Sequence, residues 1–348
     1  MRETLQAQAD EVALERSADG AARPQLSPQF AGGEDVWHEG ERAAQAKLGV
    51  TARMQEVGQR ALRSFMPAQH RAFFAKLPFL VVGSVDGMGR PWASLLFGRP
   101  GFATSPDPIS LIVAALPDAR DPLAEALIEG ATLGLLGIEL PTLWRNRLNG
   151  HVASVDARGF SLCVDQSFGN CAQYIHRRDY AGLPLEAVGA QLRVDRFERL
   201  DEETAALVAR ADTAFVASAA APKGGRSHGV DVSHRGGVAG FLKLDRDGNI
   251  LLPDYRGNFF FNTLGNLLVN PRIGLTLVDF ESGDLLQLTG TAEILWEGEA
   301  LREHPGARRL CRITPLRGQW ARGGFPLKTS LRQISPQAIA MLGSPQER

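Results

Sequence analysis

The chain has 348 residues, and at about 150 residues per domain this length predicts roughly two domains. Hydrophobic residues make up 44% and charged residues 22%, which excludes a chain that is disordered or of low complexity throughout. The net charge is −1, from 38 basic and 39 acidic residues. Such a chain has no basic field to attract nucleic acid or an anionic membrane surface, so we expect neither as a partner.

Targeting and redox signals predict a cytoplasmic protein. Residues 1–35 are polar and lack the apolar core of a signal peptide, so we expect a mobile N-terminal arm. The longest strongly apolar stretch, residues 109–116, is too short to span a bilayer. Cys163, Cys171 and Cys311 form no CxxC pair, which argues against a disulfide framework.

The first half of the chain predicts helices followed by short strands. Apolar residues at helical spacing indicate helices over 41–65 and 68–75. Short apolar runs separated by Gly and Asp turns then predict an antiparallel β unit, with a short helix at 121–129. Its strands are expected at 79–84, 92–97, 110–115, 132–138, 150–155 and 160–166.

The second half repeats this order of elements. A helix is expected over 201–212, and a second short helix over 262–269, which ends at Asn270-Pro271. A turn at 245–249 joins two strands of a hairpin. The strands are expected at 215–219, 230–233, 240–244, 250–252, 273–279 and 285–296.

The two halves contain similar segments in the same order. GRPWASLLFGRPGF at 89–102 corresponds to GRSHGVDVSHRGGVAGF at 225–241, and GLLGIELPTLWRNRLNG at 134–150 corresponds to GLTLVDFESGDLLQLTG at 274–290. The glycines that bound the second pair are 140 residues apart at both ends. Chance matching in a glycine-rich chain is the alternative. We interpret the pattern as a duplicated β unit that forms a pseudo-dimer within one chain.

The densest group of polar residues lies in the second half. The run 231–237 ends a strand with Ser233, His234 and Arg235, followed by two glycines, and Tyr255-Arg256-Gly257-Asn258 comes about 20 residues later. Two arginines beside the start of a helix at Asn262 would suit a phosphate, which needs guanidinium and backbone N–H donors. The alternative is an ordinary turn and a solvated strand end.

A second group, at 165–175, closes the first half. It places an aromatic ring, three carboxamides, a thiol and a phenol around Gly169, which would suit a flat aromatic ligand; an ordinary turn is the alternative. Cys171 and Tyr174 are its candidates for catalysis, without further support from their neighbours. The chain has no GxGxxG, P-loop or HExxH motif, and its histidines lack metal-ligand spacing, so we predict no metal site.

Several of these segments together resemble a known family. DVSHRGG, the DxxGN hairpin, PDYRGNxxFNTLGNLLxNP and QLTGTAEI are similar to the flavin-binding split β-barrels related to pyridoxamine 5′-phosphate oxidase. WHEGE at 37–41 and SFGNCxQYI at 167–175 resemble a subgroup with two tandem barrels. The resemblance implies a mainly β (α+β) fold of two tandem split barrels with flanking helices. The divisions we expect are the arm at 1–35, a first barrel at 36–190 and a second barrel at 191–348.

The family resemblance also implies a cofactor site. The FMN phosphate would lie against the second barrel, the flavin ring would lie between the barrels near Gln287, and residues 167–174 of the first barrel would close the site. There would be one flavin site per chain. The cofactor-binding residues implied are Ser233, His234, Arg235, Gly236, Tyr255, Arg256, Gly257, Asn258, Asn262, Asn266, Gln287, Ser167, Phe168 and Asn170.

The sequence departs from the family where Arg256-Gly257-Asn258 replaces the basic Ser-Arg-Lys motif, so oxidation of a B6 vitamer is not predicted. Our leading hypothesis is a flavin-dependent oxidoreductase that uses FMN, with FAD as the alternative, a small-molecule substrate and a reductant. The other hypotheses are a non-enzymatic module that binds flavin or haem, and a degenerate barrel that mediates interactions. Some split barrels bind haem or a deazaflavin. The pseudo-dimer would be a monomer or would pair as a homodimer.

Overall fold

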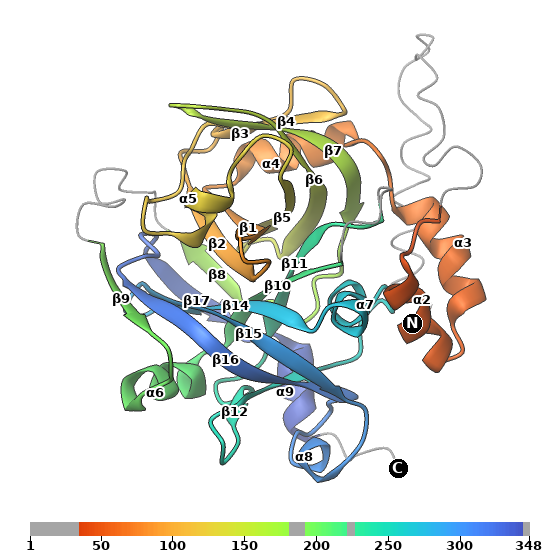
Figure 1. Cartoon of the computed structure of the whole chain (residues 1–348), viewed down its shortest axis with the longest axis vertical. Coiled ribbons are helices and arrows are strands. Elements are labelled where there is room, and N and C mark those ends of the chain that lie inside the picture. The colour runs from red at the N-terminus through yellow and green to blue at the C-terminus, as the bar shows by residue number, and fades with distance from the viewer. Residues whose placement is uncertain (1–34, 181–191, 221–226, 344–348) are drawn as a thin grey trace.

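The computed structural model describes residues 35–180, 192–220 and 227–343, and Figure 1 shows their arrangement. The predicted N-terminal arm lies outside the described residues, apart from Asp35. Two large antiparallel sheets form the body of the molecule, and helices lie around them. The predicted fold class, mainly β with flanking helices, is therefore confirmed.

The first sheet contains seven strands in the order β2-β1-β5-β6-β7-β4-β3. The sequence predicted most of them, although β6 and β7 are longer than expected and β3 was missed. The strands are β1 (Phe79–Val85), β2 (Pro91–Phe97), β3 (Ala103–Thr104), β4 (Ser110–Val113), β5 (Thr132–Glu139), β6 (Trp144–Asp156) and β7 (Gly159–Gly169).

The second sheet has the same plan, in the order β11-β10-β14-β15-β16-β13-β12, and β9 adds to β16. Each strand of the first sheet therefore has a counterpart nine positions later, from β1 and β10 to β7 and β16. The strands are β9 (Arg193–Phe197), β10 (Thr213–Ala219), β11 (Val230–Gly236), β12 (Lys243–Leu244), β13 (Ile250–Asp254), β14 (Arg272–Asp279), β15 (Asp284–Leu295) and β16 (Arg309–Arg322). This shared order supports the duplication inferred from the sequence.

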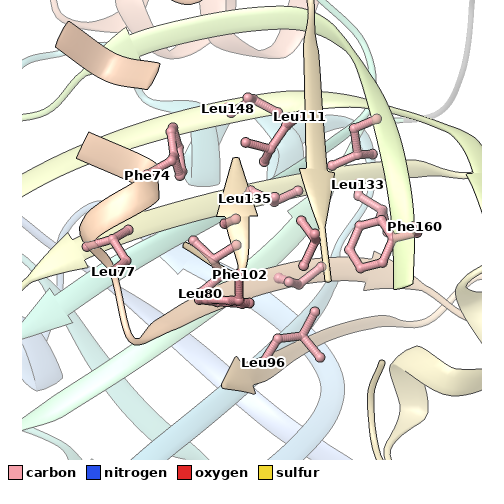
Figure 2. Packing of buried hydrophobic residues seen from close by; sticks show 14 of the residues in the cluster. Phe74, Leu77, Leu80, Leu96, Phe102, Leu111, Leu133, Leu135, Leu148 and Phe160 are labelled. Atoms are coloured by element: carbon pink, nitrogen blue, oxygen red, sulfur yellow. The ribbon is translucent and has the colours of Figure 1, made fainter. Parts of the chain in front are cut away.

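Each sheet wraps around its own apolar core. In the first sheet, leucines from β1, β4, β5 and β6 pack with phenylalanines from β7 and from α4 (Ala68–Lys76), as Figure 2 shows. Phe74 and Leu77 close this core from the side of α4. The second sheet has a corresponding core, which α6 (Glu202–Arg210) and α7 (Asn262–Val269) help to cover.

The two sheets meet through the strands at their centres. β1, β2 and β5 contact β10, β11 and β14, and Val81, Phe215 and Val232 belong to the apolar cluster between them. Glycines permit the close approach at two related points. A Cβ on Gly134 would lie 2.5 Å from the carbonyl oxygen of Val230, and one on Gly274 would lie 2.6 Å from that of Pro91. The packing between the sheets is thus nearly symmetric.

The N-terminal helices differ from the single predicted helix over 41–65. The chain forms α2 (Glu39–Lys47) and α3 (Thr51–Ala61), and Gly49 adopts a φ of 67° between them, which ends the first helix. α2 lies directly against α7, where a Cβ on Gly40 would be 2.1 Å from the carbonyl oxygen of Gly265. The N-terminal helices therefore rest on the second half of the chain.

The remaining elements include several that the sequence did not predict. The unpredicted ones are α8 (Glu299–Arg302), α9 (Pro336–Gly343), β8 (Arg177–Tyr180) and β17 (Thr329–Gln333), together with β16 described above, whereas α5 (Pro122–Ala126) is the short helix expected at 121–129. β8 and β17 pair with each other in a two-stranded sheet, so the C-terminal region returns to the first half. The division into domains at 190–191 stays a prediction.

Candidate functional site

An open cavity of about 120 Å³ lies where the two sheets meet. Its walls come from both halves of the chain: β6 and the segment after β7 on one side, and β11, the segment 254–261 and the start of α7 on the other. We call it the first cavity. A concave site between two packed sheets is a common place for a small molecule or cofactor to bind. Its principal polar residues are Arg145, Arg147, Asn170, Cys171, Gln173, Tyr174, Ser233, His234, Arg235, Asp254, Tyr255, Arg256, Asn258, Asn262, Thr263 and Arg309.

Arg147 of β6 links the two sheets at the base of this cavity. Its Nη1 donates to Oδ1 of Asp231 at 3.1 Å, and its Nη2 donates to Oγ of Ser233 at 2.5 Å. Asn149 also donates to Asp231, at 2.8 Å. Because the guanidinium is buried and held from two directions, it presents a fixed positive charge to the cavity.

The cavity is strongly basic. Five arginines line it, and Asp254 is the only acidic residue among the described lining residues. Asp254 accepts a hydrogen bond from Nε of Arg309 at 2.8 Å and lies 3.9 Å from Arg235. Burial lowers the pKa of Arg145 to about 9, and the charges of Arg147 and Arg235 act in the same direction. An anion in the cavity would offset this crowding of positive charge.

Several buried polar atoms that belong to the lining residues have no hydrogen-bond partner among the described residues. They are Nε of Arg145, Nε of Arg147, Nδ2 of Asn170 and Nδ1 of His234. Buried polar groups in folded proteins are nearly always paired, so such a group of unpaired atoms indicates a missing polar partner. A ligand with several acceptor atoms fits this arrangement.

His234 of β11 is buried, and its imidazole packs edge-on against Phe215 with ring centroids 5.8 Å apart. Burial lowers the pKa of His234 well below its usual value, and the charge of Arg145 acts in the same direction. The imidazole is therefore neutral near pH 7 and is able to accept a hydrogen bond or bind a metal ion.

The segment after β7 closes one side of the cavity. Tyr174 lies on Tyr255, with ring centroids 5.2 Å apart and an interplanar angle of 31°, and its Oη donates to the carbonyl oxygen of Arg256 at 3.0 Å. Tyr174, Phe259 and Phe261 have φ values of 68°, 64° and 62°, a region that residues other than glycine seldom adopt. Backbone strain of this kind concentrates at functional sites.

The start of α7 faces the cavity and has no side-chain cap, so its first N–H groups are not satisfied by a capping residue. Oγ1 of Thr263 donates to Oγ of Ser233 at 3.2 Å. Nδ2 of Asn262 donates to Oε1 of the buried Glu41 at 2.6 Å, which fixes the side chain at the helix start. An uncapped helix start beside arginines is suited to a phosphate group.

The structure brings together most of the residues that the sequence singled out. The predicted residues that line the first cavity are Asn170, Cys171, Tyr174, Ser233, His234, Arg235, Gly236, Tyr255, Arg256, Gly257, Asn258 and Asn262. Their roles in binding or catalysis stay predictions.

Three predicted residues lie behind the cavity wall. Asn266 donates to Oδ2 of Asp231 and to Oγ of Ser218, both at 3.0 Å. The hydroxyl of Ser167 bonds to Nδ1 of His70 at 2.9 Å, and Phe168 lies under the guanidinium of Arg147 at 5.2 Å. Phe168 therefore packs behind a lining residue, whereas Asn266 and Ser167 bond to residues outside the lining of the first cavity.

The structure separates Gln287 from the other predicted residues. Its Nε2 donates to the carbonyl oxygen of Ala93 and to Oδ2 of Asp121, each at 3.1 Å, and it borders a different cavity. The reason is that β15 crosses onto β2 of the first sheet, whereas β11 faces the first sheet on the other side of the interface. The first cavity has Arg147 in the corresponding place.

Three arginines that line the first cavity were not predicted from the sequence: Arg145, Arg147 and Arg309. Arg145 and Arg147 alternate along β6, so both side chains point to one face of the strand. The 140-residue offset between the repeats places Arg147 opposite Gln287, and this signal could have identified it. Arg309 begins β16, a strand that was not predicted.

The comparisons with known proteins support the family resemblance for the second half. Residues 200–321 match the model of the family described as pyridoxamine 5′-phosphate oxidase. This range runs from the beginning of α6 to the end of β16 and includes β11, the segment 254–261 and α7. The resemblance stated from the sequence is confirmed there. No curated protein matches the chain.

Among solved structures, HupZ from Group A Streptococcus aligns at 20% identity over 33% of this chain and 89% of its own, with a TM-score of 0.27. HutZ, the haem storage protein from Vibrio cholerae, aligns at 15% identity over 36% and 96%, also with a TM-score of 0.27. A conserved hypothetical protein from Mycobacterium tuberculosis aligns at 17% identity over 43% and 91%, with a TM-score of 0.23. TM-scores this low do not establish a structural relationship between these proteins and this chain.

Two further findings concern the described part of the chain. Its side chains contain no group of three or more His, Cys, Asp or Glu residues placed to hold a metal ion. Among its helices, none combines the length and the apolar character needed to cross a membrane.

Proposed function

We propose that the first cavity binds the phosphate and ring of a flavin mononucleotide and that the chain is a flavin-dependent oxidoreductase. The observation that carries this proposal is the set of five arginines around an open cavity that contains unpaired buried polar atoms. The match of residues 200–321 to the pyridoxamine 5′-phosphate oxidase family supports it.

The residues present fit such a cofactor. Arg235, Arg256 and the uncapped start of α7 would hold the phosphate, because they combine guanidinium donors with backbone N–H groups. Arg147 and Asn170 have buried donors for which the described part of the chain supplies no acceptor. Both would supply hydrogen bonds to the ring or the ribityl chain.

A bound flavin would supply the hydride or single-electron chemistry. The chain would orient it through residues from both sheets and exclude water from one side with Tyr174 and Tyr255. The neutral His234 would be able to accept or donate a proton within the cavity. The arginines would stabilise negative charge that develops on the ring during reduction.

The first test is the absorbance spectrum of the purified full chain, together with the mass of whatever acid releases. A two-banded flavin spectrum and release of FMN would support the proposal. Release of FAD would correct the cofactor. A colourless protein that takes up neither flavin would contradict the proposal and favour an interaction domain.

The phosphate contact is tested by comparing FMN with riboflavin, which lacks the phosphate. We expect Arg235→Gln to weaken FMN binding by about 10- to 100-fold, the usual range for one lost charge-assisted hydrogen bond, and to leave riboflavin binding unchanged. Arg90→Gln is the matched control, because the Arg90 side chain is 21% exposed and that of Arg235 is 24% exposed. An equal loss for both ligands would contradict the assigned phosphate site.

A second candidate function is haem binding, for storage or sensing. It is favoured by the neutral His234, whose Nδ1 is buried and unpartnered in the described chain, and by the arginines, which would pair with propionates. A Soret band in the purified chain, or on addition of haem, would support this candidate. Loss of the band in His234→Leu would identify the iron ligand.

A further inference from the structure

A second cavity lies where the internal symmetry of the chain places the counterpart of the first. In β1, Gly83 pairs with Gly134 and with Ala93. In β10, Ala217 pairs with Gly274 and with Val232 in the same way. Counting along β2 and β11 from these pairs, Ser94 corresponds to Ser233 and Leu96 corresponds to Arg235.

The same register relates the strands that cross the interface. Leu136 pairs with Arg147 in the first sheet, and Thr276 pairs with Gln287 in the second. In the first cavity, Arg147 of β6 donates a hydrogen bond to Ser233 of the other sheet. In the second, Gln287 of β15 donates to Asp121 of the other half. Asp121 in turn accepts a hydrogen bond from Ser94 at 2.5 Å. Each cavity therefore includes a side chain of one sheet that forms a hydrogen bond with the other half of the chain.

The second cavity is larger than the first and lacks its positive charge. Its volume is about 240 Å³, against about 120 Å³. Leu95, Leu96, Phe97 and Leu116 contribute apolar walls, and within the described chain no arginine or lysine lines it. A ligand held by its phosphate has no cationic partner there.

The charged groups of the second cavity are carboxylates. Asp121 is half-buried, and desolvation raises its pKa. Asp118 lies 2.8 Å from Nε of Arg120, which is not a lining residue. Because both acidic side chains border the cavity, it disfavours an anion whether or not Asp121 is ionised.

One polar acceptor remains available in the second cavity. Nε2 of Gln319 donates to Oε1 of Gln287 at 2.8 Å, which turns the carbonyl oxygen of Gln319 away from that bond. No hydrogen bond to this oxygen is found in the described part of the chain. A cavity that combines apolar walls with a few placed polar groups is typical of small-molecule sites.

We propose that the second cavity is a binding site for an uncharged, largely apolar small molecule, distinct from the anion site in the first cavity. Its apolar walls would bury the body of the ligand, and the Gln319 carbonyl oxygen would accept a hydrogen bond where the ligand carries a donor. The site does not depend on the cofactor proposed for the first cavity.

The test titrates the full chain with Nile red, a neutral fluorophore whose emission rises and shifts to the blue in apolar surroundings. We expect saturable binding of about one molecule per chain. Leu116→Glu places a charge at the mouth of the cavity and is expected to weaken binding by about tenfold or more, because the charge must be partly desolvated. Ile112→Glu is the matched control, since Leu116 and Ile112 are both 43% exposed and Ile112 lies outside the cavity.

Equal binding by the wild type and Leu116→Glu, or equal weakening in Ile112→Glu, would overturn the proposal. Displacement of Nile red by FMN, or its loss in Arg235→Gln, would place the dye in the first cavity and would also overturn it. Circular dichroism of each variant would show that it is folded. FMN binding is measured separately by visible absorbance, so failure at either cavity is recognised independently of the other.

Discussion

The two cavities occupy corresponding places in a duplicated fold, and they differ in how their polar atoms are satisfied. Four buried polar atoms of the first cavity's lining residues lack a partner in the described chain, whereas none of those in the second cavity does. In the second cavity, Asp121 accepts hydrogen bonds from both Gln287 and Ser94. A polar network that satisfies itself is stable without a ligand, and one that leaves donors unpaired is suited to binding one.

The largest effect is expected when Arg147 of the first cavity is replaced by glutamine, the residue type that occupies the corresponding position, 287, beside the second cavity. Arg147→Gln would remove a buried charge that pairs with Asp231 and Ser233 across the interface. Breaking such a pair costs about 3–5 kcal/mol of unfolding free energy, and we expect flavin binding to be lost as well. Urea denaturation and visible absorbance would measure both effects.

The matched variant for this comparison is Gln287→Ala, at the corresponding position of the second cavity. Because it removes neutral hydrogen bonds, we expect a smaller loss of stability and full retention of flavin. Equal flavin loss in the two variants would contradict the assignment of the anion site to the first cavity alone.

A smaller effect is expected from His234→Leu, because the register places Leu95 at the corresponding position of the second cavity. The folded-state pKa of His234 is lowered, so the unfolded chain binds a proton below about pH 6.5 that the folded chain does not. Stability is therefore lost as pH falls, by up to about 1.4 kcal/mol per pH unit from this group.

The variant lacks this contribution, so its unfolding free energy should fall less than that of the wild type between pH 7.5 and pH 5.5. Denaturation at the two pH values measures the difference. Parallel pH dependence in the two proteins would show that His234 titrates normally in the folded state.

The smallest effect is expected from Tyr174→Phe. This substitution removes the hydrogen bond to the carbonyl oxygen of Arg256 and keeps the stack on Tyr255. We expect flavin to dissociate a few-fold faster, since one neutral hydrogen bond contributes about 1 kcal/mol. Stopped-flow dissociation would measure the rate, and Tyr180→Phe, on a residue outside the first cavity, is the control. An unchanged rate would mean that Tyr174 does not close the site.

The sequence was most informative where local pattern and function coincide. The helix over 262–269 has the predicted bounds, because an apolar run is followed by Asn270-Pro271. The residues of β11 and of the segment 254–258 were identified as one site because they combine guanidinium groups with glycines. These features depend on neighbours in sequence.

The parts that were missed depend on contacts between distant segments. Arg147 belongs to the site because the two sheets meet, and Arg309 belongs to it because β16 pairs with β13 and brings Arg309 opposite Asp254. The pattern within β6 or β16 does not predict either contact. Gln287 borders the other cavity for a similar reason, because β15 contacts β2 of the first sheet. The break at Gly49 was missed because the apolar spacing continues across it while the backbone adopts a positive φ.

The first cavity also has a consequence for the order of events during synthesis. Its lining residues extend from Leu136 to Arg309, and α2 rests on α7 from the far end of the chain. When only the first half has been synthesised, Arg147 has no Asp231 with which to form its ion pair. The nascent chain therefore completes this cavity only when translation is nearly finished, and a chain truncated before β16 would carry half of a binding site.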